Sequence, residues 1–269
     1  MALSLGIEIE AVALRMLSPP TSLPSAPNGQ LSLIAIALER ADLPARVYRP
    51  STTRGSGPKY NIWNVTTDVT VMEATSGAFE LISPIFDTAS SDWRSHLRRC
   101  VNAIGTEILW KSNRSTDLHV HIGRGMDDAK FTLEEVKKLA ISYCRFESAI
   151  DQFHPAHRRM DNDYVESVRN NNLIRNSSLA QVYAMIQDAD TIEEICEIVN
   201  LKEGRHFHEF KDDQVNFTSL KKHGTIGFRQ HEGTIDAEKM IKWARFVLKF
   251  VNAAINNPLR DDHGTWWRL

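Results

Sequence analysis

Leu118-His119-Val120-His121-Ile122-Gly123 is the stretch around which the fold of this chain is organised. It places a His-x-His in an apolar run that ends at a glycine. Side chains two positions apart on a strand point to the same face, so His119 and His121 would project together while the apolar residues face a core. Neutral imidazole is a common metal ligand and can also donate to a phosphate oxygen. The stretch predicts a strand with a binding face, and the alternative is a pair of surface histidines without a ligand.

A second strand with two different faces is expected at residues 5–11, where Glu8 and Glu10 alternate with apolar residues. Adjacent glutamates on one face repel by roughly a few tenths of a kcal/mol, and a bound cation would remove this repulsion. A solvated outer face is the alternative interpretation. Further along, Glu80 stands inside the apolar strand 79–82, where an unpaired carboxylate would need a cation, an arginine or water.

Strand and helix patterns follow one another through the rest of the chain. Ser90 or Ser91 is expected to cap one helix, Thr132 and Glu135 form the capping box of another, and Asp236 caps the last long one. Other helices are expected at 31–41, 178–187 and 191–199, and other strands at 45–48, 62–65, 69–71, 215–217 and 225–230.

Several segments are expected to be loops. They are the proline-rich segment 18–29, the segment 50–58, a turn at 221–224, and 154–159, which reads as solvated surface or an anion-binding loop. A second His-x-His, His206 and His208, lies among charged residues and is expected to be surface. The tail with Trp266 and Trp267 is expected to pack as a strap or to contact a partner.

Composition narrows the class of protein. The 269 residues carry 32 basic and 34 acidic side chains, so no excess of charge points to nucleic acid or a membrane surface. We expect no membrane span, no signal peptide, and three buried thiols in a reducing compartment, hence a cytoplasmic protein. We expect one domain over 1–269, and the sequence does not indicate an oligomeric state.

Five segments, in this order, resemble the amidoligase family, whose better-known relatives are glutamine synthetase and glutamate–cysteine ligase. They are Gly6-Ile7-Glu8-Ile9-Glu10, Trp63 with Asp68, Glu80-Leu81-Ile82-Ser83-Pro84, the His-x-His strand, and Phe228-Arg229-Gln230-His231-Glu232-Gly233-Thr234-Ile235-Asp236. The resemblance implies an α+β fold like that of glutamine synthetase. Helices would pack on one face of an antiparallel sheet, and the other face would form an active-site trough.

The resemblance also implies a reaction. ATP with Mg²⁺ would phosphorylate a small-molecule carboxylate, and an amine would attack the acyl phosphate to form an amide. Implied metal ligands are Glu8, Glu10, Glu80 and His119; His121, Arg229 and Asp68 would contact the nucleotide; Arg229, Glu80 and Glu232 would act in the chemistry.

One position departs from the family pattern. Relatives usually have Glu-Phe-Arg, with the glutamate a metal ligand, where this chain has Gly227-Phe228-Arg229. Glu232 or water could substitute, or one metal site could be weakened or lost. We favour retained catalysis. The alternatives are an ATP-independent acyl transfer, cyclisation or hydrolysis on the same fold, and a non-catalytic protein that binds a metabolite or a partner.

Overall fold

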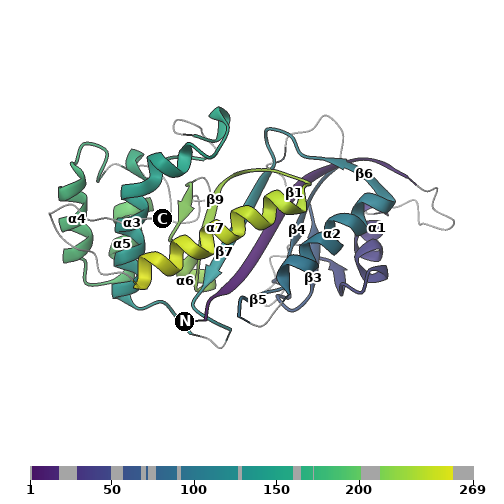
Figure 1. Cartoon of the computed structure of the whole chain (residues 1–269), viewed down its shortest axis with the longest axis horizontal. Coiled ribbons are helices and arrows are strands. Elements are labelled where there is room, and N and C mark those ends of the chain that lie inside the picture. The colour runs from purple at the N-terminus through teal and green to yellow at the C-terminus, as the bar shows by residue number, and fades with distance from the viewer. Residues whose placement is uncertain are drawn as a thin grey trace.

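Strand β1 (Ser4–Met16) runs through the centre of one sheet in the computed structural model of this protein (Figure 1). It pairs antiparallel with β4 (Ala78–Ile82) and with β7 (Asp117–Gly123). The strand order is β2-β3-β4-β1-β7-β9-β8, and β5 and β6 pair with the two ends of β1. In the described part of the chain, β2 with β3 is the one parallel pair. The fold is therefore α+β with a largely antiparallel sheet, as predicted.

The structure describes residues 2–17, 29–49, 57–67, 71, 77–89, 92–126, 129–159, 165–171, 173–200 and 213–256. The other strands are β2 (Ala45–Val47), β3 (Trp63–Thr66), β5 (Phe86–Asp87), β6 (Ile108–Lys111), β8 (Val215–Asn216) and β9 (Thr225–Glu232). The helices are α1 (Gly29–Arg40), α2 (Trp93–Glu107), α3 (Leu133–Asp151), α4 (Leu179–Asp188), α5 (Ile192–Asn200), α6 (Ser219–His223) and α7 (Ala237–Asn256), with short 3₁₀ turns η1 (Ala156–Arg158) and η2 (Val168–Asn170).

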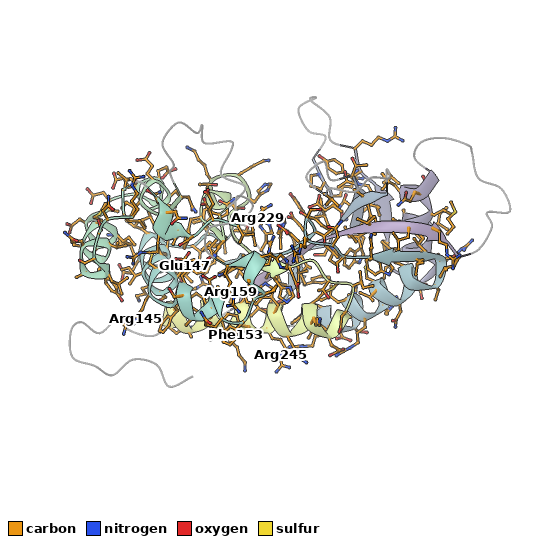
Figure 2. All side chains as sticks on the ribbon, turned by 90° about the horizontal axis from the view of Figure 1, so that it is seen from above. Arg145, Glu147, Phe153, Arg159, Arg229 and Arg245 are labelled. Carbon is orange, nitrogen blue, oxygen red and sulfur yellow. The ribbon has the colours of Figure 1, made fainter. Side chains whose placement is uncertain are left out.

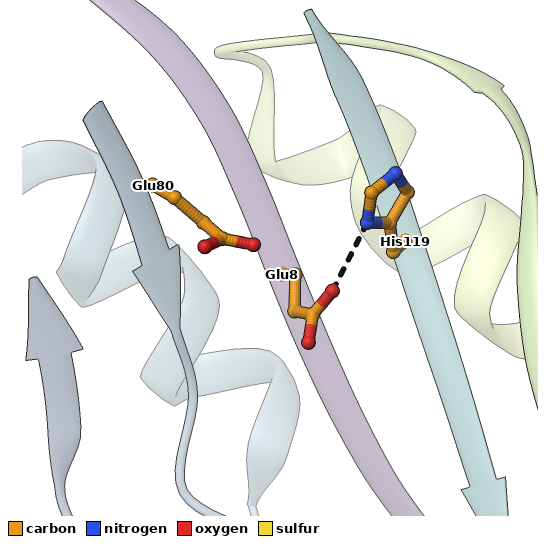
Figure 3. A group of neighbouring side chains, drawn as sticks. All are labelled: Glu8, Glu80 and His119. Carbon is orange, nitrogen blue, oxygen red and sulfur yellow. Dashed lines mark hydrogen bonds and ion pairs between the residues drawn. The ribbon is translucent and has the colours of Figure 1, made fainter. Parts of the chain in front are cut away.

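Alternation along β1 and β7 separates an apolar face from a polar face. Ile7, Ile9 and Val120 are buried in one hydrophobic core that also includes side chains from α1, α2, α3 and α7. Glu8 and His119 occupy the alternate positions, and in Figure 3 the helices lie behind the strands that carry them. Helices α1, α2, α3 and α7 therefore pack on the apolar face, which leaves the polar face available for a site.

Helix starts follow their capping residues. Thr132 forms both hydrogen bonds of the predicted capping box, and Asp236 accepts two backbone N–H groups at the start of α7. The prediction that Ser90 or Ser91 caps α2 is wrong, because the N-cap residue is Asp92, whose side chain accepts a backbone N–H of the first turn. Aspartate caps a helix as well as serine does, so local preference did not distinguish neighbouring candidates.

Two other local predictions are wrong. The expected turn at 221–224 is the short helix α6, which ends at Gly224 with a left-handed φ of 67° that glycine adopts without strain. The segment 154–159 is not solvated surface: His154 and Arg158 are buried, because the chain turns back after α3 and η1 packs against β9.

Some predictions concern the chain as a whole. Cys100, Cys144 and Cys196 are buried and unpaired, as expected. Among the residues described here, no helix is long and apolar enough to cross a membrane. The single domain over 1–269 stays a prediction. Segments outside the described residues include most of the strand expected at 69–71, the loops 18–28 and 50–56, His206, His208 and the tail with Trp266 and Trp267.

Candidate active site

The strand register brings acidic and imidazole side chains onto the polar face of the sheet. Glu8 of β1 is paired with His119 of β7, and Glu10 of β1 is paired with Glu80 of β4. Paired residues on neighbouring strands lie on the same face, and so does His121, two positions beyond His119. Residues that are far apart in the sequence therefore meet in one place.

Glu8, Glu80 and His119 form what we call the outer group (Figure 3). Their potential ligand atoms all lie within 4.8 Å of one another, and His119 Nδ1 is 3.0 Å from Glu8 Oε2. Carboxylate oxygens suit Mg²⁺, and Mn²⁺ accepts both carboxylates and imidazole. The Glu8 side chain is 24% exposed, so a cation bound here could be reached by substrate.

Glu10, Asp117 and His119 form a second, inner group. His119 Nε2 is 3.4 Å from Asp117 Oδ2 and 3.6 Å from Glu10 Oε1. These three side chains are only 2–13% exposed, so the inner group is less accessible than the outer one. Asp117 was not predicted as a site residue, although it stands two positions before His119 and alternation alone puts it on the same face.

Charges in the two groups shift one another's pKa values. Burial tends to raise the pKa of Glu8, but the charges and hydrogen bonds of His121 and His119 outweigh it and hold this pKa well below its ordinary value. Burial and the charge of Arg229 lower the pKa of His119. The hydrogen bond to Asp117, the charge of Glu10 and the hydrogen bond to Glu8 act the other way and raise it to about 9. A protonated His119 thus neutralises the carboxylates, a role that a divalent cation would take over by displacing a proton.

His121 lies between Glu8 and the β9 strand. Its Nε2 is 3.5 Å from Glu8 Oε2, and its Nδ1 is 3.2 Å from Thr225 Oγ1. Gly227 is its partner in the β7–β9 register, and a Cβ on this glycine would lie 3.2 Å from His121 Cε1. The imidazole therefore fills the space next to the position where the family pattern has a glutamate.

Two of the other predicted site residues, Arg229 and Glu232, lie on β9. Arg229 of β9 is near enough to His119 to lower its pKa, and in Figure 2 it lies on the side of the molecule away from α7. Glu232 is paired in register with Asp117 but belongs to neither group. Asp68 lies outside the described residues. The roles implied for these residues stay predictions.

One buried residue of the site has no distinguishing signal in the sequence. Arg158 of η1 is 1% exposed, and its guanidinium is 2.6 Å from Asp117 Oδ1. The neighbouring Arg159 is half-buried and donates to the backbone carbonyl of His154. Two successive arginines therefore have different surroundings, and only the tertiary structure tells them apart.

A pocket of about 250 Å³ opens beside the outer group. Glu8 and His121 line it together with Tyr60, Ile82 and Lys222, the last contributed by α6. Burial and then the charge of Glu8 raise the pKa of Tyr60 to about 12, so its hydroxyl stays protonated and can donate a hydrogen bond. The pocket therefore combines an apolar wall, a cation and a hydroxyl donor next to the candidate metal ligands.

Comparison with known proteins bears on the class of this site. Residues 2–251 match a family model described as "Putative amidoligase enzyme". No curated protein matches the chain. A solved structure of glutamine synthetase from Plasmodium falciparum is similar to 94% of this chain, with 10% sequence identity and a TM-score of 0.44, and the chain spans about half (51%) of that protein's length. Because the family model covers nearly the whole chain, the chain belongs to the amidoligase family.

Proposed function

We propose that this protein is an ATP- and Mg²⁺-dependent ligase that joins a small-molecule carboxylate to an amine. Family membership supports a ligase-type function. The outer group is the observation that carries the proposal. Two carboxylates and an imidazole from three neighbouring strands place their potential ligand atoms within 4.8 Å of one another, at the edge of a pocket.

The outer group has the donor chemistry for a divalent cation. Glu8, Glu80 and His119 would hold it, with Glu10 of the inner group as the further predicted ligand. Because one donor is an imidazole, Mn²⁺ is a suitable probe beside Mg²⁺. When bound, the nucleotide and the metal supply a phosphoryl group whose negative charge is partly neutralised.

Side chains in and around the outer group would bind the reacting groups and accept a proton. Arg229 would hold the negative charge of a carboxylate or phosphoryl oxygen with its fork of donors, and His121 would donate to a phosphate oxygen. The substrate carboxylate would be activated as an acyl phosphate, and the amine nitrogen would bond to the acyl carbon as phosphate leaves, which yields the amide. Glu80 or Glu232 would accept the proton that the amine loses.

The pocket beside Glu8 offers room for the small-molecule substrate. Ile82 supplies an apolar wall, and Lys222 and the Tyr60 hydroxyl supply groups that attract an anion or an acceptor. We expect Lys222→Ala to raise the KM for the acid substrate more than it lowers kcat, because this residue would contribute to binding and not to the reacting atoms.

The direct test is to incubate the protein with ATP, Mg²⁺ and panels of small acids and amines. ADP, phosphate and new amide masses are then measured. Glu80→Gln is expected to lower turnover by about 100-fold, the upper end of the loss that follows removal of a residue that supports a metal ligand. Glu39→Gln, the same substitution at an exposed position of α1, serves as the matched control and should leave turnover unchanged.

Two outcomes would favour the alternatives. Product formation without nucleotide would indicate an ATP-independent acyl transfer, cyclisation or hydrolysis. A non-catalytic binding protein predicts no thermal shift with ATP and Mg²⁺, whereas a ligand at 100 times its Kd stabilises by about 2.7 kcal/mol. Absence of nucleotide turnover with every candidate, including a cell metabolite extract, would contradict the ligase proposal.

A further inference from the structure

Arg158 links the two strands that carry His119 and Arg229. Its Nη1 is 2.6 Å from Asp117 Oδ1 on β7. Its Nη2 donates to the carbonyl of Arg229 at 2.6 Å, and its Nε donates to the carbonyl of Gln230 at 3.3 Å, both on β9. A buried cation is costly unless it is paired and hydrogen-bonded, and here every nitrogen of the guanidinium has a partner.

The carbonyls that Arg158 contacts belong to an irregular part of the sheet. Leu118 is paired with His231 and Val120 with Phe228, so the β7–β9 register shifts opposite His119. The shift leaves residues 229 and 230 of β9 facing a single residue of β7, which is a β-bulge. Bulges change the direction in which a side chain points, and they leave backbone groups without their usual partners. The guanidinium satisfies those carbonyls at the point from which Arg229 projects.

Asp117 connects this arginine to the histidine. One of its carboxylate oxygens faces Arg158, and the other is 3.4 Å from His119 Nε2. The opposite ring nitrogen, Nδ1, is 3.0 Å from Glu8 Oε2 in the outer group. A metal-binding imidazole commonly donates its second N–H to a carboxylate, which fixes its orientation. Asp117, already paired with an arginine, is suited to that supporting contact, and the accessible Glu8 side is suited to the cation.

We propose that Arg158 and Asp117 are positioning residues, which orient His119 with Nδ1 toward Glu8 and Glu80 and hold the bulge from which Arg229 projects. This inference rests on the proposed function for its purpose, since it assumes a cation at the outer group. It assigns to Asp117 of the inner group a supporting role: Nε2–H of His119 donates to Asp117, and Nδ1 carries the lone pair that would bind the ion.

The test measures Mn²⁺ affinity by calorimetry and by electron paramagnetic resonance, without nucleotide or substrate. Arg158→Lys and Asp117→Asn are each expected to weaken Mn²⁺ binding by roughly 10- to 100-fold, the usual effect of losing a residue that supports a metal ligand. Arg159→Lys is the matched control, because it makes the same substitution one position along the same segment, and it should bind like wild type. With Mg²⁺ bound, long-range ¹H–¹⁵N spectra should show His119 protonated at Nε2.

Several results would overturn the proposal. The first is that folded Arg158→Lys and Asp117→Asn bind Mn²⁺ as tightly as the wild-type protein. The second is that His119 is protonated at Nδ1 with the ion bound, and the third is that the wild-type protein binds no Mn²⁺. If Arg158→Lys does not fold, the double variant Arg158→Met/Asp117→Asn removes both charges of the pair, and the same loss of Mn²⁺ affinity is expected from it.

The two proposals fail in different ways. A protein that binds Mn²⁺ with the expected losses in the variants, yet turns over no ATP with any substrate, supports the positioning roles and contradicts the ligase. A protein that forms amides from ATP while Arg158→Lys keeps full Mn²⁺ affinity contradicts the positioning roles and supports the ligase.

Discussion

His121 lies against Gly227 at a paired position of β7 and β9, and a Cβ at position 227 would be 3.2 Å from His121 Cε1. That distance is tighter than ordinary van der Waals contact, so any side chain at position 227 requires the ring to shift by a few tenths of an ångström. The absence of a side chain on Gly227 thus leaves room for the imidazole on β7, which lies only 3.5 Å from the carboxylate of Glu8.

Gly227→Glu tests whether position 227 faces the cation. A carboxylate there would add a ligand near Glu8, and we expect Mn²⁺ to bind about tenfold more tightly, or about 1.4 kcal/mol. Gly227→Ala is the control, because its Cβ displaces His121 equally but adds no ligand. Calorimetry compares the two variants, and equal Mn²⁺ affinities would show that this position is not directed toward the ion.

Mn²⁺ should stabilise the folded protein through the outer group. At 100 times its Kd, the ion is expected to add about 2.7 kcal/mol to the free energy of unfolding, which raises Tm by several degrees. Glu80→Gln should abolish most of this shift because it removes one ligand, whereas Glu39→Gln should keep it. Differential scanning calorimetry with and without Mn²⁺ measures the effect. A shift of the same size in Glu80→Gln would mean that the ion binds elsewhere.

Glu147 predicts a pH dependence of stability away from the site. Burial has the largest effect on the pKa of this α3 carboxyl and raises it to about 7. The hydrogen bonds that the carboxyl accepts from Ser167 and the Val168 backbone lower this pKa. Among the smaller effects, the charge of Asp151 raises the pKa and that of Arg169 lowers it. The pKa of Glu147 is higher in the folded protein than in the unfolded one, so protonation of this carboxyl stabilises the folded state. This stabilisation is fully present below about pH 4.5. It is lost as the pH rises through 7 and amounts to at most about 3 kcal/mol.

Glu147→Gln should remove that dependence. Glutamine resembles the protonated acid, since it can accept from the Val168 backbone and donate to Ser167. Urea unfolding at pH 5 and at pH 8 should therefore show a smaller loss of stability for the variant than for wild type. Parallel pH profiles for the two proteins would contradict the prediction.

Ile9→Ala tests the apolar side of β1. Ile9 is fully buried between Glu8 and Glu10 in the sequence, but on the opposite face. Truncation should cost about 2–5 kcal/mol through lost burial and the cavity that remains. Urea unfolding measures this cost. In the folded protein at low temperature, Mn²⁺ affinity should stay within about threefold of wild type, and a larger loss would indicate that the two faces of the strand are not independent.

Much of the fold follows from local pattern. Alternation of apolar and polar residues predicts the strands that carry Glu8 and His119, an apolar run predicts the strand that carries Glu80, and helical spacing with a capping box predicts α3. These are properties of consecutive residues, so they can be seen without knowing what packs against them. The same alternation places Asp117 on the face of His119, so its position at the site can also be predicted from the sequence.

The contacts between side chains that are far apart in the sequence do not follow from local pattern. His119 contacts Glu8 across 111 positions of sequence, and that contact depends on β1 and β7 being neighbours in register. Nothing local separates the buried Arg158 from the half-buried Arg159, because the difference arises only when η1 packs against the bulge of β9. The chain pattern therefore determines strands, helices and the polar face, whereas the pairing of ligands and the burial of a charge depend on long-range contacts that only the folded structure supplies.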